Sequence, residues 1–298
     1  MTNRFPIVIA AVLLPFGAAA QQHFPKQIAA GNYSGICHIG AGRYAVVNDK
    51  SEEDGFSVFN IETDTVKGRI TAIADEGFRS SGQPNRDGEG ICYCPATNTV
   101  FISGEKDNEV LEYTLEGQLT GRRLEMPPHF AKANKNFGLE SLAYDSTRQL
   151  FFTTTERPLP GDSLLRIQTF GNDLKPRCQY LYSPDAPISR KHFHGVAELC
   201  ALPDGRLLVL ERQIKVPRLK IGASTVIRIY EVQPAEDEKL QKRLLLQFKT
   251  RLNLFSRKFA NYEGMCHLGG HKLLLIADSQ NQSKGILRDW FKTVPLAP

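Results

Sequence analysis

A short motif recurs five times along the chain, and this repetition constrains the fold more than any other feature. In each copy a polar residue precedes an apolar run. The copies are Tyr33-Ser34-Gly35-Ile36-Cys37, Gly88-Glu89-Gly90-Ile91-Cys92, Leu139-Glu140-Ser141-Leu142-Ala143, Ala197-Glu198-Leu199-Cys200-Ala201 and Tyr262-Glu263-Gly264-Met265-Cys266. With Ser34, Glu89, Glu140, Glu198 and Glu263 taken as equivalent, consecutive copies lie 55, 51, 58 and 65 residues apart. Repeats of about 40–50 residues are typical of β-propellers, and longer loops account for the additional length.

Further strand-like runs follow each motif. The second runs are 44–49, 100–105, 150–156, 207–211 and 273–278, and each ends in an acidic residue. The third runs are 56–61, 109–115, 163–169, 225–232 and 285–290, and the fourth are 69–74, 122–126, 178–182 and 243–248. Short β-branched or aromatic runs between turn residues indicate an all-β fold. The sequence predicts a five-bladed β-propeller; a six-bladed ring with one weak repeat and a β-sandwich are the alternatives.

The fifth repeat ends before a fourth strand is visible. The residues before the first motif supply a surplus strand-like run at 24–29. If this run pairs with the last blade, it closes the ring and removes exposed strand edges. We therefore expect an N-terminal strand to complete the fifth blade.

The first twenty residues have the composition of a secretory signal. Arg4 is followed by an apolar stretch at 7–16 and by three alanines at 18–20. We expect a signal peptide over 1–20, with cleavage near Ala20, and one domain over 21–298 that is secreted or periplasmic. A short membrane anchor is the alternative, but the apolar stretch falls short of the ~20 residues that a spanning helix needs.

The net charge and the cysteines limit which partners and which disulfides we expect. Removal of Arg4 with the signal changes the net charge from +5 to +4, which is too small to indicate nucleic-acid binding. We expect a monomer without a membrane span. Four of the six cysteines, at 37, 92, 200 and 266, occupy apolar strand positions. We expect buried free thiols with at most one disulfide, for which Cys94 and Cys178 are the candidates.

Acidic residues are predicted to gather at one mouth of the channel. If each motif begins the innermost strand of a blade, the second strand returns antiparallel and its last residue reaches the same end. The predicted metal ligands are Glu89, Glu140, Glu198 and Glu263 from the first strands and Asp49, Glu105, Glu156, Glu211 and Asp278 from the second strands. Oxygen ligands favour a hard cation, so calcium is the expected ion, and no organic cofactor is expected. A purely structural role for these acids is the alternative.

Basic residues accompany the acids. Lys50, Lys106, Arg157 and Arg212 directly follow second-strand acids. Adjacent strand residues point to opposite faces, so each base is expected to pair with an acid of a neighbouring blade. A basic rim is expected from loop residues, with an ordinary solvated surface as the alternative; these residues are Arg79, Arg86, Lys132, Lys135, Arg190, Lys191, His192, His194, Arg257 and Lys258.

The assembled motifs resemble the phytase-like propeller family described as "esterase-like activity of phytase". The matching stretches are Ser34-Gly35-Ile36, Asp87-Gly88-Glu89-Gly90-Ile91, Asn136-Phe137-Gly138-Leu139-Glu140, Glu156-Arg157-Pro158-Leu159, the run from Glu198 to Arg212, and Asn261-Tyr262-Glu263-Gly264-Met265. The resemblance implies an exported propeller that hydrolyses phosphomonoesters or other esters. The sequence departs from the family at 277–281, where Ala277-Asp278-Ser279-Gln280-Asn281 lacks one acidic residue of the usual Asp-rich run.

Two functions follow from these residues. The first is a secreted hydrolase of phosphate or carboxylate esters, assisted by calcium, with Glu140 and Glu198 orienting water and with Arg157 and Arg212 binding a small anionic ester. No G-x-S-x-G motif is present, which argues against a serine esterase. The second is a non-catalytic propeller that binds a ligand or partner at the mouth.

Overall fold

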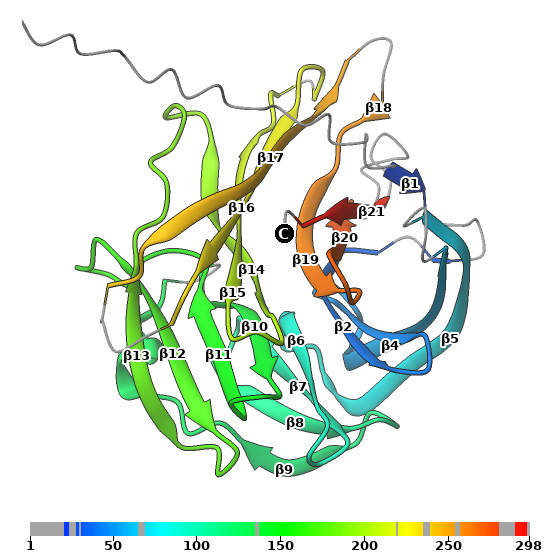
Figure 1. The fold of residues 1–298 in the computed structure, drawn as a ribbon, viewed down its shortest axis with the longest axis vertical. Coiled ribbons are helices and arrows are strands. Elements are labelled where there is room, and N and C mark those ends of the chain that lie inside the picture. Colours follow the sequence, from blue (N-terminus) through cyan, green and yellow to red (C-terminus); the bar gives the residue numbers. More distant parts are fainter. Residues whose placement is uncertain are drawn as a thin grey trace, which may run out of the picture.

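The computed structural model describes residues 21–23, 28–29, 31–64, 69–134, 137–218, 220–234, 239–253, 257–279 and 290–296. Within these ranges the chain forms five antiparallel sheets that surround a channel, together with one short 3₁₀ helix at Pro128–Lys132 (Figure 1). The five-bladed β-propeller is therefore confirmed, and the six-bladed alternative is not. No helix in the described ranges is long and apolar enough to cross a membrane. The predicted signal peptide lies outside the described residues.

Each blade is a meander of neighbouring strands. The first blade contains β2 (Tyr33–Gly40), β3 (Arg43–Asn48), β4 (Glu53–Asp64) and β5 (Arg69–Pro84). The second contains β6 (Gly88–Cys94), β7 (Thr99–Gly104), β8 (Val110–Thr114) and β9 (Leu119–Arg123). The third contains β10 (Leu139–Asp145), β11 (Leu150–Thr155), β12 (Leu165–Gly171) and β13 (Pro176–Tyr182).

The fourth blade contains five strands, β14 (Phe193–Ala201), β15 (Leu207–Lys215), β16 (Ser224–Val232), β17 (Lys242–Leu252) and β18 (Arg257–Lys258). The fifth contains β19 (Asn261–His267), β20 (Lys272–Asp278), β21 (Trp290–Pro295) and β1 (Gln21–His23). The five first strands, β2, β6, β10, β14 and β19, contact one another in ring order around the channel.

An N-terminal strand completes the fifth blade, as predicted, but it lies at other residues than the sequence indicated. β1 pairs antiparallel with β21, so the N-terminus supplies the outer strand of the last blade. The pairing residues are 21–23, three residues before the predicted run at 24–29, of which residues 24–27 lie outside the described residues. The third strand of this blade is described at 290–295. Of the predicted run at 285–290, residues 285–289 lie outside the described residues.

Five apolar cores hold neighbouring blades together, one core in each gap. Between the second and third blades, for example, the rings of Phe101 and Phe151 are 4.6 Å apart. Successive side chains of a strand point to opposite faces of the blade, so apolar residues lie on both faces. Each face packs against the neighbouring blade. Burying one such side chain stabilises the fold by about 1.5–3 kcal/mol.

Three sequence-based boundaries differ in the structure. β5 continues to Pro84 instead of ending near residue 74, and its register with β4 contains several bulges. β9 covers 119–123 and not 122–126. All six cysteines are free, so the Cys94–Cys178 disulfide is wrong: Cys94 is buried in β6, whereas Cys178 is exposed on β13.

Candidate functional site

A β-bulge near the start of each first strand determines where the acidic side chains lie. In the third blade Leu139 pairs with Thr155 and Ser141 with Thr154, so Glu140 is an extra residue without a partner on β11. Glu263 is the corresponding extra residue in the fifth blade. In the first two blades the irregular segments contain Ser34 and Glu89. A bulge redirects the side chain of the extra residue, and here it recurs at one end of the channel.

The fourth blade is shifted by one residue relative to the sequence-based equivalence. Val196 pairs with Glu211 and Glu198 pairs with Leu210, so the extra residue is Ala197. Ala197 therefore corresponds to Glu140 and Glu263, and the predicted equivalence of Glu198 is wrong by one position. The end of the second strand, β15, is shifted by one residue in the same way. Arg212 pairs with Gly195 in the way that Asp278 pairs with Asn261 in the fifth blade.

The shift replaces two expected acids of the mouth by an alanine and an arginine. The residues that occupy equivalent positions are Ser34, Glu89, Glu140, Ala197 and Glu263 on the first strands and Asp49, Glu105, Glu156, Arg212 and Asp278 at the ends of the second strands. We call these ten residues the acidic mouth. It contains seven carboxylates, and Arg212 is the only cation among its ten positions.

Arg212 forms ion pairs with carboxylates of two other blades. One terminal nitrogen lies 3.0 Å from Oε1 of Glu140 and 3.5 Å from Oε1 of Glu156, and the other contacts Glu263. The arginine side chain is 13% exposed. Burial removes water from this cation, and the three carboxylates compensate for that loss. Arg212 thus connects the third, fourth and fifth blades at the mouth, as expected for a base that pairs across blades.

Glu89 differs from the carboxylates around Arg212. It is 9% exposed, and none of the described residues forms a hydrogen bond or an ion pair with its carboxylate. Burial raises its pKa well above the usual value, and the charges of Glu140, Asp49 and Glu105 raise it further. An isolated buried carboxyl among like charges retains its proton to higher pH than a solvated one.

The neighbouring carboxyls also have raised pKa values. Burial is the main cause for Glu140, whose pKa is raised further by Glu156 and lowered by Arg212. Burial likewise raises the pKa of Glu156, of Glu105 and of Asp49. Many carboxylates close together cannot all ionise at neutral pH without compensation, and a cluster of raised pKa values is typical of functional sites.

Other bases lie at the edge of the mouth. Lys50 contacts its own neighbour Asp49 at 2.6 Å and Asp87 of the second blade at 3.1 Å, so the expectation of purely cross-blade pairing fails for Lys50. Lys106 contacts Asp87 of its own blade at 3.4 Å, so the cross-blade expectation fails for Lys106 as well. Arg157 lies 4.1 Å from the Phe137 ring centroid, and its Nε donates to the His194 carbonyl oxygen.

Glu198 and Glu211 lie outside the acidic mouth. Glu198 is 1% exposed, and its Oε1 accepts hydrogen bonds from the backbone N–H groups of Leu142 and Leu199. Because Leu142 lies on β10, the Glu198 side chain links the neighbouring first strands of the third and fourth blades. Glu211 accepts hydrogen bonds from Tyr182 Oη at 2.5 Å and from Lys242 Nζ at 2.7 Å, which is a structural role between the third and fourth blades.

The described residues of the predicted basic rim have different partners. Arg86 pairs with Asp107 at 2.6 Å, and Arg79 donates to the Glu76 carbonyl oxygen. His192 contacts Ser189 Oγ through Nδ1. Lys135 and the side chain of Arg257 are outside the described residues. The remaining bases of the fourth blade lie on its projecting end.

The described side chains fit a metal ion poorly. Among them, no group of three or more His, Cys, Asp or Glu side chains is arranged to hold a metal. The guanidinium of Arg212 already contacts Glu140, Glu156 and Glu263, three of the predicted calcium ligands. A divalent cation at the same place would have to displace it. We therefore derive no chemical step through calcium.

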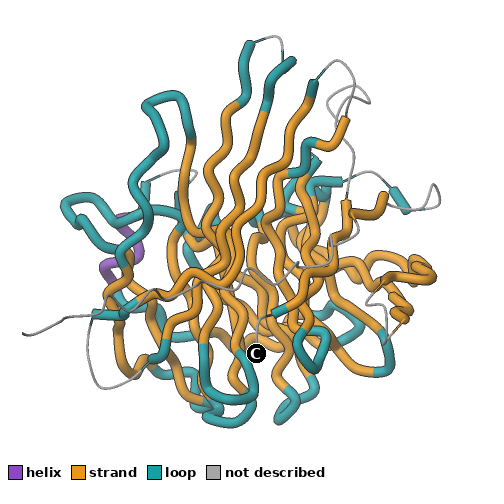
Figure 2. The backbone as a smooth tube through the Cα atoms, turned by 45° about the horizontal axis from the view of Figure 1, so that its top comes forward, coloured by secondary structure: helices purple, strands orange, loops and turns teal. Residues whose placement is uncertain are grey.

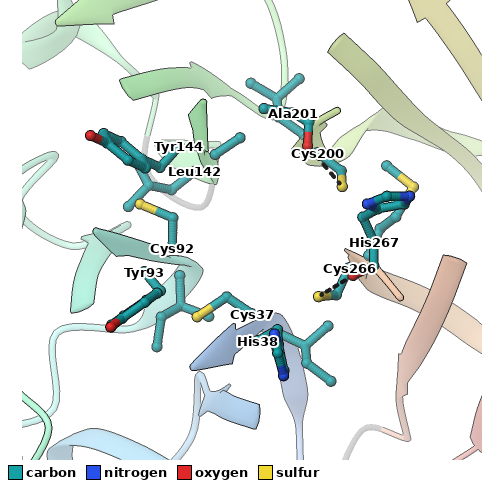
Figure 3. Close-up of a pocket in the computed structure, with 15 residues that line it drawn as sticks. Cys37, His38, Cys92, Tyr93, Leu142, Tyr144, Cys200, Ala201, Cys266 and His267 are labelled. Atoms are coloured by element: carbon teal, nitrogen blue, oxygen red, sulfur yellow. Dashed lines mark hydrogen bonds between the residues drawn. The ribbon is translucent and has the colours of Figure 1, made fainter. Parts of the chain in front are cut away.

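A cavity lies at the other end of the channel (Figure 3). It has a volume of about 140 Å³ and is lined by residues two to four positions after each bulge. Cys37, Cys92, Cys200 and Cys266 surround it, and the third blade contributes Ala143. Burial raises the pKa of these thiols, that of Cys266 to about 12, so they are protonated and chemically quiet at neutral pH.

The fold and the mouth define the class of the protein: a five-bladed β-propeller that brings carboxylates from its blades to one end of the channel. The chain belongs to the phytase-like family described as "Esterase-like activity of phytase", whose model matches residues 28–280. This confirms the resemblance found in the sequence.

The chain resembles solved structures at low identity. An endo-arabinase from Bacteroides thetaiotaomicron is 12% identical, with a TM-score of 0.51, over 91% of this chain and 95% of that chain. A streptogramin B lyase is 12% identical, with a TM-score of 0.43, over 94% of this chain and 98% of that chain. None of the curated proteins matches the sequence significantly.

Proposed function

We propose that the acidic mouth is the active site of an exported hydrolase that acts on phosphate or carboxylate esters. The observation that carries this proposal is Glu89, a buried carboxyl with a raised pKa and no ion-pair partner among the described residues. A carboxyl that keeps its proton near neutral pH can donate it to a leaving oxygen, which is the role of a general acid. Family membership supports the same reaction class.

The reaction needs two proton transfers, and the mouth offers a group for each. A water molecule forms a bond to phosphorus or to the carbonyl carbon as the bond to the leaving oxygen breaks. Glu89 supplies the proton that the leaving oxygen takes up. Glu105, which is partly exposed and close enough to influence the Glu89 pKa, accepts the proton that the water releases. Proton transfer between the two carboxyls then restores the starting state.

Arg157 is better placed than Arg212 to bind the anionic part of a substrate. Among the described residues, its Nε alone is engaged in a hydrogen bond, to the His194 carbonyl oxygen, and Phe137 lies against the guanidinium group. Its terminal nitrogens therefore remain able to bind two oxygens of an anion. Arg212 is held by three carboxylates, so we assign it a positioning role. Glu140 shares that role, and Glu198 is too deep in the channel to contact substrate.

The test is hydrolysis of 4-nitrophenyl phosphate and 4-nitrophenyl acetate by the wild type, by Glu89→Gln and by Glu116→Gln. Glu116 is exposed in the β8–β9 turn, at the other end of the second blade, and is the matched control. Loss of general acid catalysis in Glu89→Gln should lower kcat about 10²–10⁴-fold. The Glu116 variant should behave as the wild type. Equal activity of the two variants would refute the role of Glu89.

The second candidate is a non-catalytic binding propeller. It is favoured by the three ion pairs of Arg212, because they give the clustered carboxylates a structural purpose without any chemistry. This function predicts no turnover of either ester by the wild type. It also predicts that Arg157→Met weakens the binding of a small anion while the protein stays folded.

A further inference from the structure

The fourth blade extends beyond the rest of the ring on the side of the acidic mouth. The ends of β14 to β17 and the loops between them project past the neighbouring blades (Figures 1 and 2). We define the blade-4 extension as the described residues within 186–195, 213–227 and 244–258. A small apolar core of Ile214, Ala223, Leu252 and Phe259 supports it from within.

The blade-4 extension is basic throughout. The three segments contain nine Lys or Arg residues and no Asp or Glu. None of Lys215, Lys249 and Arg251 forms an ion pair with a described residue. This differs from the rest of the protein, where most bases near β-strand ends pair with acids. An uncompensated positive field at a projecting edge attracts anionic partners.

Three of these bases converge on one groove. Lys215, Ser224 and Arg251 are direct neighbours across β15, β16 and β17, so their side chains share a face of the sheet. Lys249 lies two residues before Arg251 and on the same face. With Ile188 and His192 they line a groove of about 290 Å³. The groove is large enough for a phosphate group and offers three cations and a hydroxyl to it.

Exposed apolar side chains surround the same region. Seven large hydrophobic side chains are exposed among the described residues, and five belong to the blade-4 extension: Ile188 (52%), Phe193 (64%), Val216 (43%), Ile221 (56%) and Leu244 (48%). Exposed aliphatic side chains beside unpaired bases suit a surface that is anionic outside and apolar beneath. Nucleic acid would instead require aromatic side chains on which bases stack, and the extension exposes only Phe193.

We propose that the blade-4 extension docks on the surface of an anionic lipid bilayer. Lys215, Lys249 and Arg251 contact headgroup phosphates, and Val216 and Ile221 in the adjoining loop enter the boundary between headgroups and acyl chains. The acidic mouth, on the same side of the ring, is thereby held near the membrane surface. This inference does not depend on whether the mouth is catalytic.

The experiment is co-sedimentation of the full chain with sucrose-loaded vesicles of phosphatidylcholine, with and without phosphatidylglycerol. Binding is expected only to the anionic vesicles and should weaken as salt is raised. Removing one base from an anionic surface costs about fivefold in affinity, so the triple variant Lys215→Ser, Lys249→Ser, Arg251→Ser should bind on the order of a hundredfold more weakly. The double variant Val216→Ser, Ile221→Ser should also lose roughly tenfold or more.

Lys175→Ser, an exposed base in the β12–β13 turn at the other end of the third blade, is the control and should bind like the wild type. Circular dichroism shows whether each variant is folded. Equal binding to neutral and anionic vesicles would overturn the proposal. It would also fail if a single-stranded DNA competed fully and the Val216/Ile221 variant bound vesicles normally, because the partner would then be a soluble polyanion.

Discussion

Replacing Arg212 by methionine tests the electrostatic arrangement of the acidic mouth. The substitution keeps much of the apolar stem and removes the cation that contacts Glu140, Glu156 and Glu263. Removing one partner of a buried ion pair typically costs about 3–5 kcal/mol, because the remaining charges stay buried and uncompensated. For a chain of this length that cost corresponds to a melting temperature lower by on the order of 10 °C. The measurement is thermal unfolding followed by circular dichroism at pH 8.

The size of the effect should depend on pH. The native pKa values of Glu140 and Glu156 are raised above their ordinary value of 4.5, so the native state binds protons more readily than the unfolded chain. The stabilisation that comes from this preferential proton binding is fully present below about pH 4.5, and it is lost as pH rises through the raised native pKa values. Arg212 lowers both native pKa values, so its removal raises them further. The variant should therefore approach the wild type at pH 4.5 and fall below it at pH 8.

Arg123→Met is the matched control, because Arg123 pairs with Glu109 at the surface and is 61% exposed. An exposed pair contributes about 0–1 kcal/mol, so this variant should melt within a few degrees of the wild type at both pH values. Adding Glu140→Gln to Arg212→Met should recover part of the lost stability by removing one uncompensated charge. A loss in Arg212→Met no larger than in Arg123→Met, or equally large at pH 4.5, would refute the reasoning.

Two further predictions concern the channel and the metal. Glu198→Gln keeps the oxygen that accepts hydrogen bonds from Leu142 and Leu199, and it removes a carboxyl whose pKa is raised by burial. At pH 8 the variant should therefore be more stable than the wild type by about 1 kcal/mol or more, and at pH 4.5 it should be equally stable. A variant that is destabilised at pH 8 would contradict this. The melting temperature should be the same in millimolar calcium as in a chelator, because Arg212 already lies among the carboxylates. A melting temperature that rises by several degrees in calcium would mean that the ion displaces Arg212.

Most of the fold could be predicted because it depends on local patterns that repeat. Alternating apolar residues between turns identify strands, and five copies at similar spacing identify blades. The closing strand was harder to place. A three-residue strand such as β1 has almost no pattern of its own, and its position depends on pairing with β21, which is distant in sequence. The extension of β5 to Pro84 likewise depends on its partner β4.

The one-residue shift in the fourth blade shows why the site could be predicted only in part. Four of the five copies place a glutamate near the start of the first strand, and in the fourth copy Glu198 fits that pattern in the sequence. The register of the bulge, which decides where the side chain lies, is set by pairing with β15. One sequence signal was available. Cys37, Cys92 and Cys266 lie three residues after the aligned polar residue, whereas Cys200 lies only two residues after Glu198.

Because of that shift, the positive charge that faces the carboxylates of the acidic mouth belongs to a side chain of the protein and not to a bound ion. A bound metal ion would leave when its concentration falls, and the carboxylates would then repel one another. Arg212 instead remains charged at every physiological pH and is fixed between the third and fifth blades. It forms ion pairs with Glu140, Glu156 and Glu263, whereas Glu89 has no ion pair with a described residue, so the positive charge is distributed unevenly over the mouth. In the proposed hydrolase, that asymmetry separates the half of the mouth that Arg212 holds together from the half in which Glu89 would transfer a proton.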